Sequence, residues 1–415
     1  MKNLEESEKR TMAFSATFAA FRHRNYRLWF WGQLLSMFGT WMQLTALGFL
    51  VYQLTNSPTY LGLVGFAAGV PYWLFTLYGG VITDRMSRRD LMVITQIGMM
   101  ILAFILAALT FTGLVQPWHI LMLAFLNGIA NAFDAPARHA LVPDMVPKED
   151  LTNAIVMNGT MYNTSTVLGP AVGGILYALV GPAWCFMING FSFLAIILGL
   201  LMMRVPPVIR KAKQESVFKE LVEGIRYVWH NPLLKGLVLL MMMTGLFGLS
   251  FMTLMPAWAV VVLKGDSTTN GLLQAARGVG ALIMALWMAS LGNFNFKGKL
   301  ITLGTFTVPF LTVIFSFIRS VPLALGMLVA LGMANLLIAN LSTVLVQLKT
   351  EDRLRGRVMG VYTFVFFGFM PLGSLWIGAT AGWLGEQAAI IICGAMTLIC
   401  ALVIWRIVPQ LTKVE

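Results

Sequence analysis

The feature that most constrains the fold is a series of apolar runs that are too long for the core of a water-soluble domain. Two of them, LGLVGFAAGVPYWLFTLY and LMVITQIGMMILAFILAALTF, flank the charged stretch GGVITDRMSRRD. A helix needs roughly 20 apolar residues to cross a bilayer. The chain is 58% hydrophobic and 11% charged, whereas soluble domains are about 45–50% apolar and about 25% charged. Since the period-two alternation of outer-membrane barrels is absent, the sequence predicts an all-α membrane protein.

Twelve apolar segments are predicted to span the membrane. Several exceed the minimum length, and a tilt in the bilayer accommodates the excess. An even number of spans places both ends of the chain on the same side. The predicted spans are residues 28–52, 60–83, 91–114, 118–139, 153–180, 183–203, 236–263, 271–292, 300–318, 322–346, 356–383 and 387–408.

Positive charge is concentrated on one side of these spans. Of the 29 Lys and Arg residues, 26 lie in the terminal segments and the even-numbered loops. The odd-numbered loops hold only Lys264 and Arg319, and Arg277 lies inside a span. This asymmetry predicts that both termini are cytoplasmic. The net charge of +12 then reflects topology, and no nucleic-acid partner is expected. The N-terminal MKNLEESEKR lacks the apolar core of a signal peptide.

The longest polar connection divides the chain into two similar parts. We predict an N-terminal six-helix half (1–204), a cytoplasmic linker (205–235) and a C-terminal six-helix half (236–415). Apolar linker residues recur at helical spacing, which predicts an amphipathic helix at the membrane interface: Val217, Phe218, Leu221, Ile225 and Val228. A faint repeat supports the division, because NSPTYLGLVGFAAG resembles DSTTNGLLQAARGVG, and KEDLTNAIVMNGT resembles TEDRLRGRVMGVYT. Two homologous halves are a common transporter plan.

Two short motifs resemble signatures of the major facilitator superfamily. The stretch Gly80-Val-Ile-Thr-Asp84-Arg85-Met-Ser-Arg88-Arg89 is similar to G-x-x-x-D-R-x-G-R-R in loop two, with Ser87 where the family usually has Gly. In the fifth span, GPAVGG is similar to the G-P-x-x-G-G segment associated with exporters and antiporters. The matching residues are Gly169, Pro170, Gly173 and Gly174. General helix packing is the alternative interpretation of this second motif, since proline kinks a helix and small residues allow close approach.

The resemblance extends over nearly the whole chain. The segments FRHRNYRLWFWGQLLSMFGTWMQ, FDAPARHALVPDMVP and LRGRVMGVYT are similar to the enterobactin-exporter and macrolide-efflux branch of the superfamily. The resemblance implies twelve helices in two pseudo-symmetric six-helix bundles, a bacterial-type inner membrane and a monomer. It also implies that Asp84 faces Arg355 and Arg357 across the halves and latches them on the cytoplasmic side. The alternative is a solvated loop with no gating role.

Asp134 is the acidic residue predicted to lie within a span. Asn127 and Asn131 precede it by seven and three residues and share its helix face. One interpretation is a protonatable group that couples proton entry to substrate exit. The other is a structural partner of Arg85 or Arg138, which we favour because nearby basic residues keep a carboxylate ionised.

Arg277 is expected to face a central cavity or another helix, because a lipid-facing Arg is costly. It could bind an anionic or oxygen-rich substrate, or it could anchor neighbouring helices by hydrogen bonds. Gln274 lies one turn away. Further polar residues of the spans are candidates for the cavity lining: Gln33, Ser36, Thr40, Gln43, Asn158, Tyr162, Thr166, Asn335 and Tyr362.

No nucleophile–base pair, metal-ligand cluster or nucleotide-binding loop is apparent, so no enzyme activity, metal or cofactor is expected. The three Cys residues lie in apolar runs and lack metal-binding spacing. The sequence therefore predicts a secondary transporter that exports a small organic molecule by alternating access, with protons as the coupling ion. An importer, facilitator or lipid flippase on the same fold is the first alternative. A non-transporting membrane scaffold is the second.

Overall fold

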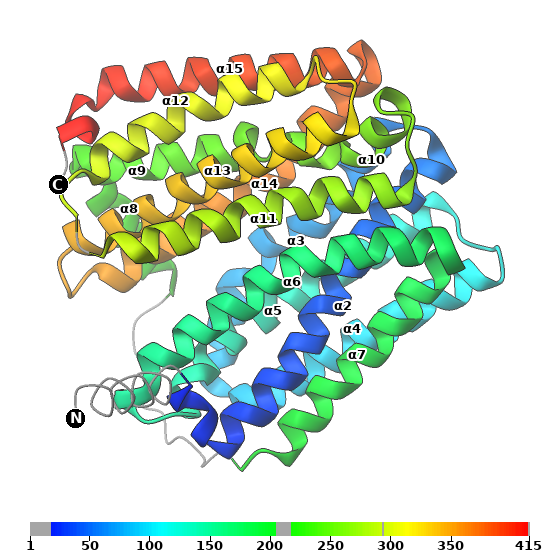
Figure 1. Cartoon of the computed structure of the whole chain (residues 1–415). Coiled ribbons are helices and arrows are strands. Elements are labelled where there is room, and N and C mark those ends of the chain that lie inside the picture. The colour runs from blue at the N-terminus through cyan, green and yellow to red at the C-terminus, as the bar shows by residue number, and fades with distance from the viewer. Residues whose placement is uncertain (1–17, 205–216, 293, 414–415) are drawn as a thin grey trace, which may run out of the picture.

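The computed structural model describes residues 18–204, 217–292 and 294–413, with side chains except at 76–85, 217–220 and 413. All regular elements in these ranges are helical (Figure 1). Eleven segments of the described part are long and apolar enough to cross a membrane. Helix α3 (Pro58–Arg85) occupies the position of the remaining predicted span. The prediction of an all-α membrane protein with twelve spans is confirmed.

The helices form two bundles that Figure 1 shows one above the other. The first contains α2 (Arg24–Thr55), α3, α4 (Arg88–Phe111), α5 (Pro117–Leu141), α6 (Leu151–Val180) and α7 (Pro182–Met202). The second contains α9 (Pro232–Met243), α10 (Met255–Ala257), α11 (Ser267–Leu291), α12 (Lys297–Phe315), α13 (Val321–Lys349), α14 (Arg355–Leu384) and α15 (Glu386–Ile407). Short 3-10 segments are η1 (Ala19–Arg22), η2 (Val142–Asp144), η3 (Lys148–Asp150) and η7 (Pro409–Lys413).

The seventh predicted span departs from a regular helix. After α9 the chain forms the π-helical segment η4 (Thr244–Gly248), the 3-10 segment η5 (Ser250–Leu254), α10 and a second π-helical segment, η6 (Trp258–Val262). Gly245 packs closely against the Phe366 carbonyl of α14, and Pro256 lacks the N–H that a continuous helix needs. The expectation of one continuous helix over 236–263 is therefore wrong, although the segment still has the length of a span.

The molecule has two chemically different ends, each formed by helix ends from both bundles. We call the end where α2, α4 and α14 begin and α5 and α15 finish the basic end, because Arg24, Arg88, Arg138, Arg355 and Arg406 lie there. The opposite end is called the distal end. Ser87 caps α4 at the basic end by accepting a hydrogen bond from the Asp90 N–H (3.3 Å). A Ser at this signature position therefore starts a helix.

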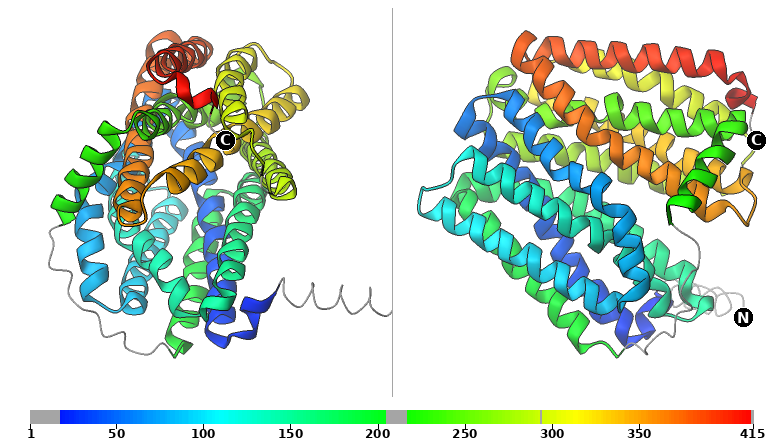
Figure 2. Two further views of the ribbon diagram at one scale, coloured as in Figure 1. Left: turned by 90° about the vertical axis from the view of Figure 1, so that its left-hand side faces the viewer. Right: turned by 180° about the vertical axis from the view of Figure 1, so that it is seen from behind.

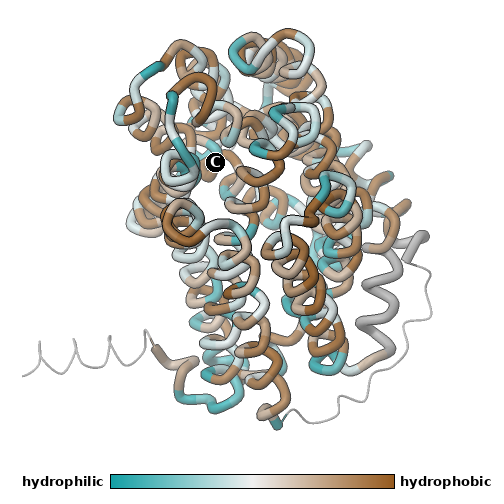
Figure 3. The backbone as a smooth tube through the Cα atoms, turned by 90° about the vertical axis from the view of Figure 1, so that its right-hand side faces the viewer, coloured by the Kyte–Doolittle hydropathy of each residue, from teal (hydrophilic) through white to brown (hydrophobic). Residues whose placement is uncertain are grey.

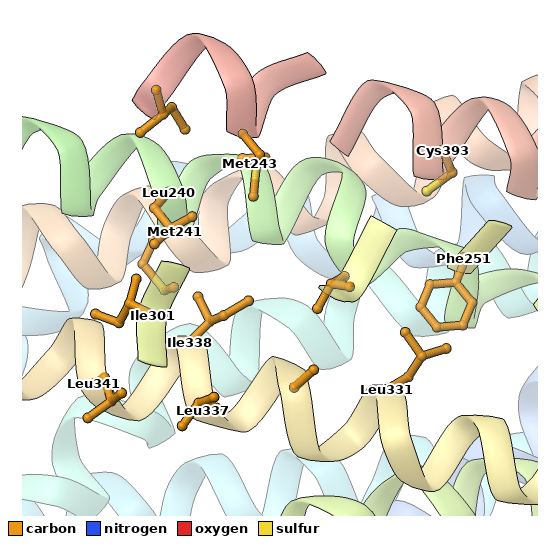
Figure 4. Close-up of a cluster of buried hydrophobic side chains, with 14 of the residues drawn as sticks. Leu240, Met241, Met243, Phe251, Ile301, Leu331, Leu337, Ile338, Leu341 and Cys393 are labelled. Carbon is orange, nitrogen blue, oxygen red and sulfur yellow. The ribbon is translucent and has the colours of Figure 1, made fainter. Parts of the chain in front are cut away.

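The two bundles are packed differently. In the second bundle one continuous cluster of buried side chains runs from Val228 to Leu411, part of which Figure 4 shows. The helices of the first bundle contribute to three smaller clusters, one of which also includes Ala257 of α10, and the buried carboxylate of Asp134 lies among them. Figure 3 shows hydrophobic residues along most of each helix and hydrophilic segments at many helix ends. This pattern suits a bilayer.

The linker helix α8 (Val217–His230) has the predicted position in the chain. It packs against α14 and α9, and Val228 is buried in the core of the second bundle. Glu223 forms an ion pair with Arg357 on α14. Trp229 and Ile225 remain exposed. The amphipathic face is therefore partly covered by protein, whereas the side chains of residues 217–220 lie outside the described ones.

Candidate functional site

Asp134 belongs to a buried polar network inside the first bundle. Its Oδ1 accepts hydrogen bonds from Gln96 Nε2 (2.9 Å) and Thr95 Oγ1 (3.0 Å) on α4. Arg138 Nη1 lies 3.9 Å from its Oδ2, and the carboxylate is 1% exposed. The Ser36 hydroxyl of α2 donates to Gln96 Oε1 (3.4 Å). The network thus joins α2, α4 and α5 around one carboxylate.

Sequence reasoning did not single out Thr95 and Gln96. Their signal was two adjacent polar residues in the run LMVITQIGMM, which is otherwise apolar. The predicted partner Arg138 does lie beside Asp134, whereas the side chain of Arg85 lies outside the described residues. Asn127 and Asn131 are half-buried on the same helix, and the Asn131 side chain donates to the Asn127 carbonyl (3.0 Å).

The polar stripe of α2 contacts neighbouring helices of its own bundle. Gln33 and Ser36 are 1% and 2% exposed, and Gln43 Oε1 accepts a hydrogen bond from Asn189 Nδ2 of α7 (2.8 Å). The Thr40 hydroxyl donates to the Ser36 carbonyl (2.8 Å). The structure therefore places much of this predicted cavity lining within the bundle.

Helices α6 and α11 pack against each other across the two bundles, and we call this contact the polar seam. Gly174 and Gly271 meet there, because a Cβ added to either would lie 2.9 Å from the Cα of the other. The Ser267 hydroxyl donates to the Gly174 carbonyl (3.1 Å). Gly278 packs against the Thr166 carbonyl. Close approach of the backbones requires the small residues at these positions.

The exporter-type motif faces two different helices. Gly169 and Gly173 pack against the α2 backbone near Phe38 and Met42. Gly174 instead faces α11, as does the carbonyl of Pro170, which lies against Gly271. The motif therefore packs α6 against its own bundle and against the other bundle.

Side-chain hydrogen bonds strengthen the polar seam toward the distal end. The Thr45 hydroxyl of α2 donates to Gln274 Oε1 (3.4 Å), and Asn270 Nδ2 donates to the Thr45 carbonyl (3.5 Å). Gln274 Nε2 donates to Asn270 Oδ1 (3.3 Å). Gln274 was a sequence candidate, but Thr45 and Asn270 were not. Asn270 lies four residues before Gln274, so the helical spacing could have identified it.

Arg277 lies one turn closer to the basic end on the same face of α11. The adjacent Gly278 packs against the Thr166 carbonyl of α6, which lies one turn from Tyr162. The Tyr162 and Trp41 rings contact edge to face, with centroids 5.9 Å apart. Tyr162 lies midway along α6, yet its side chain is 48% exposed. The sequence candidates Tyr162 and Arg277 are therefore brought together from opposite bundles.

The remaining cavity candidates are divided between the two bundles. Asn158 is half-buried on α6, one turn from Tyr162, and the Thr166 hydroxyl donates to the Asn163 carbonyl (2.8 Å). Asn335 lies within the second bundle and donates to the Leu331 carbonyl (2.9 Å). Tyr362 is 6% exposed, and its hydroxyl lies 3.1 Å from that of Thr343. Asn335 thus bonds within its own helix, α13, whereas Tyr362 of α14 bonds to α13, and both are buried.

Helices α3 and α14 form the second contact between the bundles, which we call the aromatic seam. A Cβ added to Gly378 would lie 2.7 Å from the Gly62 Cα. Closer to the middle of the helices, the Trp73 indole covers Gly368, and the Tyr72 and Phe367 rings lie 5.8 Å apart. The glycine pairs of both seams lie in the distal halves of their helices, and the aromatic seam continues to about the helix midpoints. From there the bundles diverge toward the basic end (Figure 1 and the right panel of Figure 2).

The basic residues of the predicted latch have local partners. Arg88 pairs with Asp144 (2.8 Å), and Arg89 donates to the Met203 carbonyl (3.2 Å). Arg355 pairs with Asp352. Arg357 pairs with Glu223 of α8, a partner that the sequence did not suggest. The side chains of Asp84 and Arg85, like Gly80, lie outside the residues whose side chains are described.

The described part also has a surface groove that contains no predicted site residue. A shallow groove lies on the outer face of α12, lined by Thr302, Leu303, Phe306, Thr307, Phe310 and Leu311. Among the described residues, no group of three or more His, Cys, Asp or Glu side chains is arranged to hold a metal ion.

Comparison with known proteins shows which family and which proteins the chain resembles. Residues 15–415 match the family described as transmembrane secretion effectors. The chain is 24% identical to the staphyloferrin A transporter of Staphylococcus aureus over 92% of this chain and 96% of that protein. It is 21% identical to macrolide efflux protein A of Streptococcus pyogenes over 95% of this chain and 99% of that protein.

Solved structures share the fold at lower sequence identity. One is a bacterial homologue of the human lysosomal transporter Spinster, in an inward-facing and unoccupied conformation. It superposes with a TM-score of 0.72 at 14% identity and covers 94% of this chain and 98% of its own.

Proposed function

The chain belongs to the transmembrane secretion effector family of the major facilitator superfamily, and from this premise we propose that it exports a small organic molecule of the drug or siderophore class. A transporter, and not an enzyme, is what the family contains. The macrolide efflux protein and the staphyloferrin A transporter among its relatives support the proposed direction and substrate class. The proposal includes alternating access driven by proton antiport, with one chain as the transporting unit in a bacterial inner membrane.

The observation that carries the proposal is that both seams close the distal ends of the two bundles. If the basic end faces the cytoplasm, as the positive-inside asymmetry favours, the two bundles lie apart on the side from which an exporter loads. Both termini are then cytoplasmic, and the boundaries at residues 204 and 235 separate the two moving halves. Transport requires these seams to open while the basic ends approach each other.

Asp134 is the candidate proton-coupling residue, and a structural role is the interpretation that its basic neighbour favours. Its carboxylate accepts two hydrogen bonds from α4 while Arg138 lies close to its second oxygen. Protonation would remove the charge that holds these groups and would weaken the connection between α2, α4 and α5. A purely structural role for the same contacts is the competing proposal.

The substitution Asp134→Asn separates the two roles. Asparagine retains an oxygen that can accept from Thr95 and Gln96, but it cannot bind or release a proton. A coupling role predicts that substrate still binds while proton-driven transport is lost. A structural role predicts nearly normal transport for Asp134→Asn and loss of folded protein only for Asp134→Ala.

Asp84 is the proposed latch, which would form when the basic ends meet. An anion is stabilised near a helix N-terminus, and α14 begins at Arg355. We expect Asp84→Asn to impair transport with little effect on expression or folding. Unchanged transport would argue against the latch and for a solvated loop.

Inside-out membrane vesicles test the function directly. A fluorescent macrolide and a ferric siderophore are offered outside, and uptake is followed with and without a proton gradient. Gradient-dependent uptake that a protonophore abolishes is the expected result. Equal uptake without a gradient would indicate a facilitator, uptake only in right-side-out vesicles an importer, and movement of labelled lipid alone a flippase. Absence of transport for every compound would favour a scaffold.

A further inference from the structure

Arg277 is a charged side chain of α11 with no hydrogen-bond or ion-pair partner among the residues whose side chains the structure describes. It lies on α11, ten residues from the distal start of that helix. Its Nε is buried without an acceptor, and no hydrogen bond or ion pair within the described part involves its guanidinium. A guanidinium has five N–H donors and is charged at any physiological pH. Leaving a buried N–H without an acceptor is costly, whereas the rest of the side chain is partly exposed and free to bind a ligand.

The described residues offer no acid that could neutralise this charge within the protein. Asp134 is buried in the first bundle and already accepts from Thr95 and Gln96, with Arg138 beside it. Asp266 caps the distal start of α11 by accepting from the Thr269 N–H (3.0 Å). Neither of these acids is therefore available to neutralise Arg277.

Neutral side chains near Arg277 form an open surface. Gly278, next to Arg277, packs against the Thr166 carbonyl one turn from Tyr162, and the half-exposed Tyr162 ring contacts Trp41. The hydroxyl of Tyr162 can donate a hydrogen bond to an oxygen that Arg277 also binds. Trp41 adds a flat apolar surface beside that position. Gln274, one turn toward the distal end, is already bonded to Thr45 and Asn270, so it limits the surface on that side.

We propose that Arg277 and Tyr162 bind the carboxylate of an organic anion whose apolar part packs on Trp41. The guanidinium matches a carboxylate through two parallel N–H···O bonds, and one uncompensated positive charge suits one carboxylate. The inference narrows the substrate class of the proposed exporter and depends on that function only for its consequence in transport. The binding itself is independent of it.

Equilibrium binding to the purified protein tests the site with matched probes. The probes are 2-naphthoate with 2-naphthamide and octanoate with octanamide, which differ in charge but hardly in shape. Wild type should bind each carboxylate at least about 10-fold more tightly than its amide. Arg277→Gln should weaken carboxylate binding by about 10- to 100-fold and leave amide binding within twofold. Arg277→Lys should recover part of the loss.

Two controls separate this site from a general effect of charge. Arg319→Gln removes a cation that lies at the distal end, where it donates to Gln387 (2.6 Å), and should not change the preference for carboxylate. Inorganic phosphate at equal ionic strength should compete weakly. Competition by phosphate as strong as that by naphthoate would overturn the assignment to a carboxylate.

Thermal unfolding without ligand distinguishes recognition from a structural anchor. Removing a half-buried charge that has no partner among the described residues should leave the unfolding temperature of Arg277→Gln unchanged or raised. A lowered temperature, together with an equal loss of carboxylate and amide binding, would overturn the proposal. So would a wild-type protein that prefers neither carboxylate over its amide.

The same proteins in inside-out vesicles keep the two proposals apart. Selective carboxylate binding without proton-driven uptake of any compound would refute export and leave the Arg277 site intact. Proton-driven uptake of a macrolide by a protein without carboxylate preference would support export and refute the site.

Discussion

Two seams join the bundles, one between α3 and α14 and one between α6 and α11. In each seam the two helices cross at a pair of glycines, but different side chains make up the rest of the contact. Gly62 meets Gly378 in the aromatic seam, and Gly174 meets Gly271 in the polar seam. Beyond the crossings, Trp73 covers Gly368 on one side of the molecule, whereas Thr45, Asn270 and Gln274 form hydrogen bonds on the other.

The comparison suggests a division of roles between the two seams. Aromatic packing gives area and shape but no charge recognition. The polar seam leads directly to Tyr162 and Arg277, where a substrate could contact both bundles at once. We infer that the glycine crossings provide the common hinge surface and that the polar seam is the side at which substrate affects opening.

The largest expected effect on transport comes from placing a large side chain at one of the crossing glycines. Gly174→Leu would place a side chain against the α11 backbone, which cannot move aside as a flexible side chain could. Overpacking of this kind costs about 1–3 kcal/mol, so transport in vesicles should fall by about 10- to 100-fold. Gly62→Leu should have a similar effect if the two crossings are equivalent. A normal rate for one of them would show that only the other seam must close.

Glycines elsewhere on the same helices serve as controls for this prediction. Gly159 on α6 and Gly360 on α14 have no atom within 4 Å of an added Cβ. Gly159→Leu and Gly360→Leu should therefore insert, fold and transport nearly as wild type does. Equal losses in the controls would mean that any leucine disturbs these helices, and the crossings would have no special role.

The sequence was sufficient to predict much of the fold. Apolar runs of bilayer length locate the twelve spans, and the faint repeat suggests two related halves. The first glycine in each copy of one repeated segment, Gly62 and Gly271, turns out to be a crossing residue. Gly174 was already named as part of the GPAVGG motif, but its pairing with Gly271, like that of Gly378 with Gly62, could not be predicted. The paired glycines lie about 100 or more residues apart, and nothing local marks the pairing.

The sequence was less informative about the candidate site. Helical spacing showed that Gln33, Ser36, Thr40 and Gln43 share a stripe, but spacing does not reveal which helix that stripe meets. Gln43 contacts α7, whereas the neighbouring Thr45 reaches α11. The irregular seventh span was also missed, since periodicity alone does not distinguish an α-helix from a π-helical segment.

An intermediate effect is expected from removing the aromatic packing. Trp73→Ala takes away the indole that covers Gly368 and leaves a gap in the aromatic seam. We expect about a 10-fold loss of transport and faster hydrogen exchange in a peptide covering residues 368–382. Exchange in 267–278 should change less, because hydrogen bonds hold the polar seam independently. Trp383→Ala, which removes an 84% exposed ring from the distal end of α14, is the control. Equally faster exchange in both peptides would show that the seams open as one unit.

The smallest effect on ligand binding is expected from removing a single hydrogen bond. One such bond can be removed from each seam, so the two substitutions compare the seams directly. Thr45→Val removes the donor to Gln274, and Thr59→Val removes the donor to the Gly378 carbonyl (3.3 Å) of the aromatic seam. Hydrogen bonds between membrane helices contribute about 0.6 kcal/mol on average, which is roughly a threefold effect. We expect Thr45→Val to weaken the carboxylate preference about threefold and Thr59→Val to leave it unchanged, as measured by the naphthoate and naphthamide pair. Equal effects from both substitutions would mean that the seams respond alike to substrate, and the proposed division between them would have to be abandoned.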